Sequence, residues 1–327
     1  MIRWIVKSGL FFQFVLYILF IVALWIPVFI HPVSVICSPE DGPIYTFLVS
    51  FFDSSPEFST GVAFGLIILQ TFLIFLITHS NGFFGRRNFL PAIIALLVYS
   101  WNPDFQALHA MLPAGFFLLL AIQSLLVAYG KHEMHKEVFN ASFFISVASL
   151  FYLPSAFLLV FLLFVLITYR VSGWREYLIS FVGFGIPFVY YFSGLYLNDN
   201  LEWGLQLLIK SFFNFTVVKS FTNLQMAWLI ASVLILLLGI FAVLNVMKDK
   251  VISLRRRSWA LFDLVIAASI AVCLTGFNFM GSNYLFALPM SFFITGSIFL
   301  PKRPFWSETL TLAYFLFFVV IRAIQFL

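Results

Sequence analysis

Long apolar runs separated by short polar segments dominate the chain, and their lengths predict membrane-spanning helices. The run "WLIASVLILLLGIFAVLNV" at 228–246 contains no charge, and about 18 or more apolar residues in succession are typical of a transmembrane helix. Transmembrane β-strands alternate apolar and polar positions, so such continuous runs exclude that architecture. Splitting the runs at charges and at Pro, Gly and Asn clusters predicts eleven spans: 10–32, 60–79, 89–101, 107–129, 138–153, 154–169, 177–197, 226–246, 259–275, 284–300 and 305–326.

Two of these spans are short, and a third follows its neighbour without a loop. Segments 89–101 and 138–153 are shorter than a helix needs to cross a hydrocarbon core of about 30 Å. Segment 154–169 is separated from 138–153 only by Pro154, and proline disfavours helix at the residue before it. We therefore predict a hairpin of two short helices that meet near the outer face and are shielded by neighbouring helices.

The loop at 33–59 has a helical period although its apolar stretch is too short to cross a membrane. Its large apolar residues recur at i, i+3, i+4, i+7 and i+8, the stripe of a helix that lies on a surface. They are Ile44, Phe47, Leu48, Phe51 and Phe52. Pro43 suits a first turn, and Glu40 and Asp41 precede it. The pattern predicts an interfacial helix on the outer side.

The loop at 198–225 repeats this arrangement. Asp199 and Glu202 come first, and large apolar residues follow at helical spacing. They are Leu205, Leu208, Phe212 and Phe215. We expect two interfacial helices, each led by acids, to cover an outward-facing vestibule, and the short loop "SWNPDFQALH" adds Asp104 and His109 to the same side.

Composition supports this interpretation. The chain is 63% hydrophobic and 9% charged, whereas soluble domains carry roughly 25% charged residues. The first apolar run is longer than the roughly 7–15 residues of a signal-peptide core, and no small-x-small cleavage site follows it. We predict an all-α polytopic membrane protein that forms a single integral domain over residues 1–327, with an uncleaved first helix.

The positive charges predict the orientation. With the N-terminus in the cytoplasm, fifteen of the 18 Lys and Arg residues fall on the inner side, as the positive-inside rule requires. They are Arg3, Lys7, Arg86, Arg87, Lys131, Lys136, Arg170, Arg175, Lys248, Lys250, Arg255, Arg256, Arg257, Lys302 and Arg303. The net charge of +5 therefore reflects topology and not a nucleic-acid partner. With this orientation, the C-terminus is expected on the outer side.

Acidic residues gather on the opposite side, although acids contribute little to orientation. Seven map there: Glu40, Asp41, Asp53, Glu57, Asp104, Asp199 and Glu202. The adjacent pair Glu40 and Asp41 has two explanations that the sequence leaves open. Acids at a helix N-terminus complement the helix dipole, and a carboxylate can also act as a general base.

Other chemistry is sparse. His132 and His135 are three residues apart and could bind a metal, but they suit a solvated cytoplasmic turn better, so we predict no metal site from histidines. Cys37 and Cys273 both map near the outer boundary, which would permit a disulfide, but we expect two unpaired thiols. There is no phosphate-binding loop, nucleophile elbow or dinucleotide fingerprint.

Ionisable residues inside a span often mark a pathway, and in the predicted spans they are scarce. Asp263 lies near the inner end of its span, where the cluster Arg255–Arg257 can pair with it. Arg322 lies near the outer end of the last span, where it can hold a phosphate or extend to the headgroups. The scarcity of such charges argues against a proton-driven transporter.

Several motifs resemble known families. "SPEDGPIY", "SLFYLPS", "SGWREYL" and "GFGIPF" are similar, in this order, to a family of uncharacterised Bacteroidetes multi-pass inner-membrane proteins. More distantly, residues 10–195 resemble the C-type (GT-C) integral-membrane glycosyltransferases, which begin with an acidic first outer loop and a juxtamembrane helix. The second resemblance divides the chain into a GT-C-like helical module, 1–197, and C-terminal helices, 198–327.

This resemblance implies an activity at the outer face. Asp41 or Glu40 would be the catalytic base or the ligand of a divalent metal, with Asp104 as the next candidate, and Arg322 and Lys210 would neutralise the phosphate of a polyprenyl-phosphate-linked sugar. The large soluble domain usual in active members does not follow the spans in this sequence. Two alternatives therefore stay open: a non-catalytic scaffold or assembly partner of an envelope or secretion complex, and a transporter of lipids or small molecules.

Overall fold

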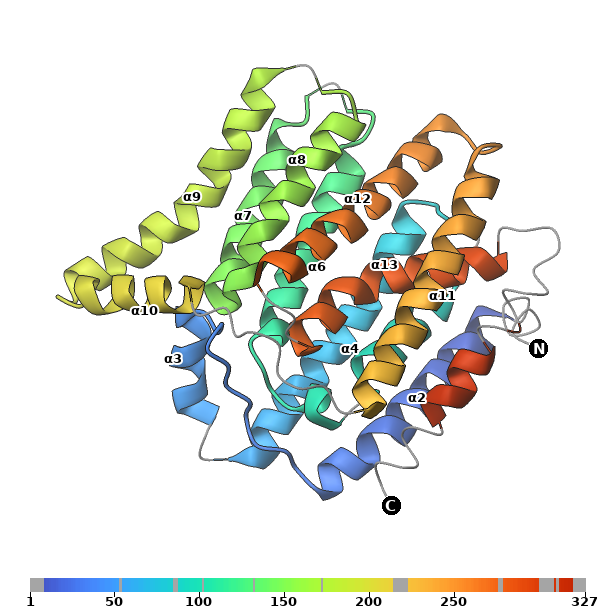
Figure 1. The fold of residues 1–327 in the computed structure, drawn as a ribbon, viewed down its shortest axis with the longest axis horizontal. Coiled ribbons are helices and arrows are strands. Elements are labelled where there is room, and N and C mark those ends of the chain that lie inside the picture. The colour runs from blue at the N-terminus through green and yellow to red at the C-terminus, as the bar shows by residue number, and fades with distance from the viewer. Residues whose placement is uncertain are drawn as a thin grey trace.

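The computed structural model describes residues 9–52, 55–84, 88–101, 103–131, 133–171, 173–213, 223–275, 279–299, 309 and 312–319. This part of the chain is helical, and its one extended pairing is a single bridge between Asp41 and Tyr152. The prediction of an all-α fold is confirmed. The helices form a bundle, with α9 and α10 at one edge and α2 at the other (Figure 1).

Each of the first ten predicted spans coincides with a helical element. In chain order the elements are α2 (Leu10–Ile30), α3 (Pro43–Phe52), α4 (Pro56–Ser80), α5 (Leu90–Tyr99), η1 (Pro103–Gln106), α6 (Met111–Ala128), α7 (His135–Phe151), η2 (Leu153–Leu158), α8 (Leu159–Thr168), α9 (Trp174–Leu197), α10 (Leu201–Phe213), α11 (Asn223–Met247), α12 (Ile252–Thr275) and α13 (Phe279–Phe299). Residues 312–319 are also helical. The rest of the predicted eleventh span lies almost wholly outside the described residues.

Within the described part, six helices are long and apolar enough to cross a membrane: α2, α4, α6, α9, α11 and α12. The weak predicted spans are short helices, as expected. The ten residues of α5 are all buried, and a helix of that length is about 15 Å long, roughly half the thickness of a hydrocarbon core. Because α4 and α13 pack on it, its polar ends are shielded by protein.

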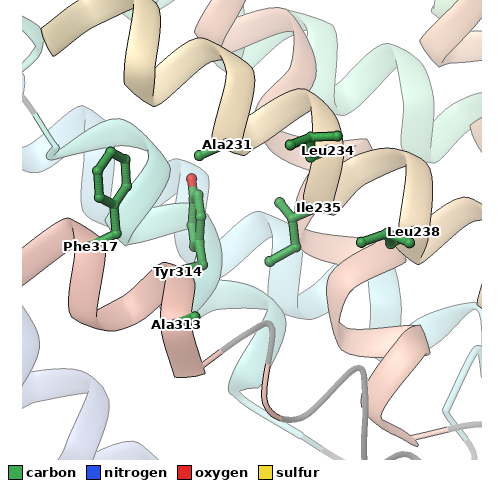
Figure 2. A pocket seen from close by; sticks show the side chains of 7 residues that line it. All are labelled: Ala231, Leu234, Ile235, Leu238, Ala313, Tyr314 and Phe317. Atoms are coloured by element: carbon green, nitrogen blue, oxygen red, sulfur yellow. The ribbon is translucent and has the colours of Figure 1, made fainter.

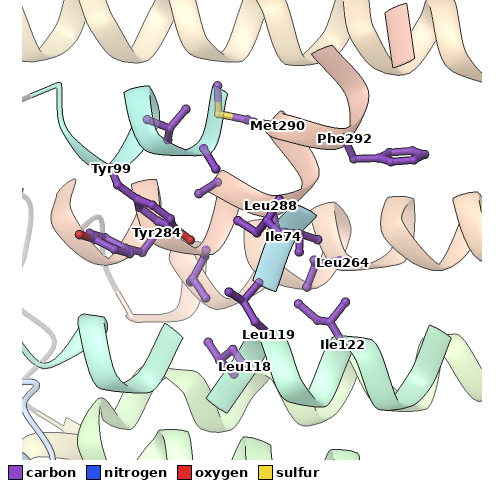
Figure 3. Close-up of a cluster of buried hydrophobic side chains, with 14 of the residues drawn as sticks. Ile74, Tyr99, Leu118, Leu119, Ile122, Leu264, Tyr284, Leu288, Met290 and Phe292 are labelled. Atoms are coloured by element: carbon purple, nitrogen blue, oxygen red, sulfur yellow. The ribbon is translucent and has the colours of Figure 1, made fainter. Parts of the chain in front are cut away.

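The core lies around α5, α6 and α13, where aliphatic and aromatic side chains from distant parts of the chain meet (Figure 3). Tyr99 and Tyr284 stack there with ring centroids 4.5 Å apart. The break predicted at Pro154 is also present, because α7 ends at Phe151 and the chain continues as the 3-10 turn η2 into α8. This break places Tyr152 at the end of the bundle.

Hydrogen bonds and a close His–Glu contact join the cation-rich helix ends on one face of the bundle. Arg256 at the start of α12 donates to the Thr168 carbonyl at the end of α8, 2.7 Å away. Arg257 donates to the Asn81 carbonyl at the end of α4, 3.3 Å away. His135 at the start of α7 lies 3.5 Å from Glu176 at the start of α9. The opposite face carries Glu40 and Asp41, because α7 runs from the first face to the second over about 25 Å.

Two details differ from the sequence prediction. The helix α12 begins at Ile252 and not at 259, so the three arginines at 255–257 lie within it; arginine is a good helix former, and its long side chain reaches past a helix end. Asp263 does not pair directly with an arginine among the described residues. Its Oδ2 accepts a hydrogen bond from Thr168 Oγ1 at 2.5 Å.

Candidate functional site

The loop between α2 and α3 is docked on the end of α7. Gly42 N donates to the Phe151 carbonyl at 2.7 Å, and Leu153 N donates to the Glu40 carbonyl at 3.3 Å. The last carbonyls of a helix have no partner inside that helix, so the loop satisfies part of the end of α7. The break at Pro154 leaves the amide of Leu153 available for the second bond. We call residues 38–42, together with Tyr152, the acid loop site.

The approach of the two backbones is close enough to require glycine. A Cβ atom at Gly42 would lie 2.1 Å from the Leu150 carbonyl oxygen, well inside van der Waals contact. Glycine is suited to such an approach because it has no side chain. The glycine therefore fixes how near the two neighbouring acids come to α7.

Both acids of the loop are buried in the bundle. Glu40 is 1% exposed and Asp41 is 5% exposed. The Tyr152 hydroxyl donates to Glu40 Oε2 at 2.9 Å, and the Ser38 amide donates to Asp41 Oδ2 at 2.6 Å. Glu40 is thus held by a residue at the end of α7, and Asp41 is held by a residue of its own loop.

The buried position changes the acidity of Asp41. Burial raises the pKa of its carboxyl from 3.8 to about 7, against the opposing effect of the Ser38 amide and with a further increase from the charge of Glu40. A general base works best with a pKa near the working pH. Asp41 therefore combines a buried position with the acidity that proton transfer at neutral pH needs.

A second polar connection joins this loop to the segment before α6. Ile36 N donates to the Leu108 carbonyl at 3.0 Å, and the Tyr45 hydroxyl lies 3.0 Å from the carbonyl oxygens of both residues. Tyr45 is 1% exposed. The helix α3 is therefore anchored by a tyrosine that the predicted apolar stripe did not include.

Two residues of the predicted stripe of α3 face away from the bundle, whereas Ile44 and Leu48 are half-buried. Phe47 and Phe51 are 64% and 61% exposed, and their rings meet edge to face at 5.1 Å. Large exposed aromatic side chains next to a buried anchor are typical of a helix that turns its apolar face to lipid. The second segment predicted as an interfacial helix is also helical: it forms α10, which lies beside the end of α9 and near α3 (Figure 1).

Asp104 does not share the buried environment of Glu40 and Asp41. It lies in the 3-10 turn η1 and is exposed. Its neighbour His109 is buried, with Nδ1 2.8 Å from the Ala107 carbonyl, and burial lowers the pKa of its imidazole to about 4. His109 is thus neutral at pH 7 and donates from Nδ1.

The two predicted phosphate ligands cannot be placed. Arg322 lies outside the described residues, as does the side chain of Lys210, whose backbone belongs to α10. A divalent metal is poorly matched by what is described. Within the described ranges no three His, Cys, Asp or Glu side chains come together as a metal site, and Glu40 and Asp41 already accept hydrogen bonds. Cys37 and Cys273 are both exposed, and no disulfide joins them.

An apolar groove begins beside the acid loop site. Its volume is about 610 Å³, and α9, α10 and the η2–α8 segment form its walls. All of its lining side chains are apolar: Leu153, Ala156, Phe157, Leu159, Phe184, Phe188, Phe192, Leu205, Leu208 and Ile209. Leu153 belongs both to the groove and to the backbone pairing with Glu40. The groove therefore reaches the residues that hold the acids.

A further apolar cavity of about 250 Å³ lies between α11 and the helical residues 312–319. Figure 2 shows Tyr314 and Phe317 on one side and Ala231, Leu234, Ile235 and Leu238 on the other. Its lining carries no charged or metal-binding side chain. The cavity is a packing gap at the bundle surface and offers no chemistry comparable to that of the acid loop site.

Comparison with known proteins adds no assignment. No family model, no curated protein and no solved structure matches the chain. Sequence analysis identified the two acids but missed Ser38, Tyr45, Tyr152 and the close approach of Gly42 to the end of α7. The two motifs "SPEDGPIY" and "SLFYLPS" contain these residues and were the available signal. In the fold they meet at the bridge between Asp41 and Tyr152.

Proposed function

We propose that this protein is a membrane-embedded transferase of cell-envelope biogenesis, with a GT-C-like arrangement in residues 1–197, which acts on a lipid-linked substrate at the outer face of a bacterial inner membrane. The observation that carries the proposal is that Leu153, which lines the apolar groove, also donates a backbone hydrogen bond to Glu40 of the acid loop site. The lipid chain of a polyprenyl-phosphate-linked sugar would lie in the groove, and its head would reach Asp41.

In this proposal Asp41 is the general base. It takes the proton of an acceptor hydroxyl while that oxygen bonds to the sugar carbon, and the bond from that carbon to the lipid phosphate oxygen breaks with its electron pair on the phosphate. A carboxyl pKa of about 7 suits this role. Tyr152 and Ser38 hold the two acids in position and do not touch the substrate.

The orientation follows from the charges. The cation-rich helix ends that Arg256, Arg257 and the His135–Glu176 contact join on one face would face the cytoplasm, and the acid loop site would then lie on the outer side. The proposal includes eleven spans, with the N-terminus inside and the C-terminus outside.

The test uses purified protein in nanodiscs with a polyprenyl-phosphate-linked sugar and an acceptor alcohol. We expect Asp41→Asn to abolish transfer while a polyprenyl phosphate still binds. Phe188→Ser should weaken that binding by about tenfold because it removes a large part of the apolar groove wall. Phe181→Ser is the matched control, since Phe181 lies on the same helix, is 54% exposed and does not line the groove. Full transfer by Asp41→Asn would exclude the catalytic role.

One observation favours a non-catalytic alternative. Glu40 and Asp41 are almost completely buried and already hydrogen bonded, as a structural latch between α2 and α7 would be. In that case the protein would be a membrane scaffold, and a stoichiometric envelope protein should co-purify with it. Loss of that complex in Tyr152→Phe, with unchanged polyprenyl phosphate binding in Phe188→Ser, would support the scaffold.

A further inference from the structure

A second large cavity lies on the cation-rich face, away from the acid loop site. The end of α8, the end of α11 and the start of α12 enclose it, and its volume is about 700 Å³. Figure 1 shows α11 and α12 joined at this end of the bundle. Three of its lining residues are cations, Lys248, Arg255 and Arg256. We call this cavity the basic pocket.

The arginine nearest α8 is held in place by the protein. Arg256 Nη1 donates to the Thr168 carbonyl at 2.7 Å, one of the carbonyls that a helix end leaves without an internal partner. Thr168 is fixed in turn, since its hydroxyl donates to Asp263 at 2.5 Å. A guanidinium has five N–H donors, so one bond to a carbonyl leaves most of them for a ligand.

Within the described part of the chain, no carboxylate neutralises the cations of the basic pocket at ion-pair distance. Among the described residues, no carboxylate oxygen lies within 4.0 Å of a side-chain nitrogen of Lys248, Arg255 or Arg256. On the same face, in contrast, Lys131 pairs with Glu137 at 2.6 Å. Three cations around one cavity create a strong positive potential, which an anionic ligand would neutralise.

The other wall of the basic pocket is apolar and accessible. Phe241 is 70% exposed and Trp259 is 40% exposed, and both line the cavity together with Leu244. Tryptophan is enriched where a membrane protein meets the headgroups. A free phosphate would contact only the cationic side, whereas a phospholipid would contact the cations with its head and the aromatic wall with an acyl chain.

We propose that the basic pocket binds the phosphate of an anionic phospholipid, with the head at Lys248, Arg255 and Arg256 and an acyl chain against Phe241 and Leu244. Basic pockets between membrane helices are suited to such headgroups. The proposal is independent of the acid loop site, because the two sites lie at opposite ends of the bundle.

The experiment measures binding of dioctanoyl phosphatidylglycerol, dioctanoyl phosphatidylcholine and inorganic phosphate to the full chain in detergent by native mass spectrometry. We expect phosphatidylglycerol to bind most tightly. The double variant Lys248→Gln, Arg255→Gln should weaken its binding about 10- to 30-fold, since each cation near a lipid surface contributes about fivefold. Lys250→Gln is the matched control, because Lys250 is an exposed cation two residues away that does not line the pocket.

The outcomes separate the sources of the phosphate. Unchanged phosphatidylglycerol affinity in the double variant, or an equal loss in the Lys250→Gln control, would overturn the site. Inorganic phosphate that displaces the lipid at equal concentration would overturn the lipid assignment and identify a free-phosphate site. Thermal unfolding without lipid checks that the double variant is folded; if it is not, Lys248→Gln alone, at an exposed side chain, should still weaken lipid binding about fivefold.

Discussion

Replacing Asp41 with asparagine removes the charge of a buried carboxylate and keeps the size of the side chain. The amide oxygen of asparagine can still accept the hydrogen bond that Ser38 N donates to Asp41 at 2.6 Å. The folded state raises the pKa of Asp41 from 3.8 to about 7. That difference corresponds to ~4 kcal/mol of free energy of unfolding, which is lost when the buried carboxyl ionises.

The sign of the pH dependence follows from proton binding. Between about pH 4 and pH 7 the folded protein holds the Asp41 proton and the unfolded chain has released it, so the folded state binds more protons. Stability must then fall as the pH rises through this window. Above about pH 7 both states are ionised at this position, and the full ~4 kcal/mol penalty is present. Asparagine does not ionise and avoids the penalty.

The measurement is the midpoint of thermal unfolding in detergent for both proteins between pH 4 and pH 8. We expect equal midpoints near pH 4 and a midpoint several degrees higher for Asp41→Asn at pH 8. The same variant should lose transfer activity, so that stability and activity change in opposite directions, as is common for functional residues. Destabilisation of the variant at pH 8 would refute the reasoning, because it would mean that the ionised carboxylate stabilises the fold.

Three further substitutions or labels test the geometry. Gly42→Ala should lower the free energy of unfolding by ~1–3 kcal/mol through overpacking against the end of α7. The control Gly65→Ala in α4, where nothing lies within 4 Å of the added carbon, should raise it slightly. Equal midpoints of thermal unfolding in the two variants would contradict the close approach at Gly42. Tyr152→Phe should cost ~1–3 kcal/mol because it leaves buried Glu40 without its hydroxyl donor, and chemical denaturation measures the loss. Cys37 is exposed and should react with a membrane-impermeant maleimide in whole cells when the other cysteine is serine; no labelling would reverse the proposed orientation.

Much of the fold was predictable because lipid constrains it so strongly. A backbone inside a membrane must satisfy its own hydrogen bonds, so a long apolar run such as 228–246 has few alternatives to a helix, and α11 (Asn223–Met247) was placed to within a few residues. The predicted span 259–275 begins seven residues after the start of α12, because a cluster of charges ends an apolar run without ending the helix. Arginines at 255–257 continue the helix beyond its apolar part.

The candidate site was predictable only in part, because its geometry depends on contacts between distant residues. The acids Glu40 and Asp41 were recognisable as an unusual pair, but their burial depends on Tyr152, which is 112 residues from Glu40 in sequence. Periodicity along one segment does not indicate such a partner. The environment of Asp104 was unpredictable for the same reason. The sequence predicts Asp104 on the same side as Glu40 and Asp41, but the fold leaves its side chain exposed.

The energetic cost of Asp41 bears on whether the acid loop site is only a latch. A neutral acceptor such as asparagine or serine could cap the same backbone amide and would avoid the ~4 kcal/mol penalty of an ionised buried carboxylate at neutral pH. The contacts to Ser38 and the bridge to Tyr152 therefore do not by themselves explain an acid at this position. A role that requires proton transfer does explain it, since the buried environment that destabilises the charge also brings the pKa to about 7. If Asp41→Asn is both more stable at pH 8 and fully functional in cells, that explanation fails and the loop is a latch.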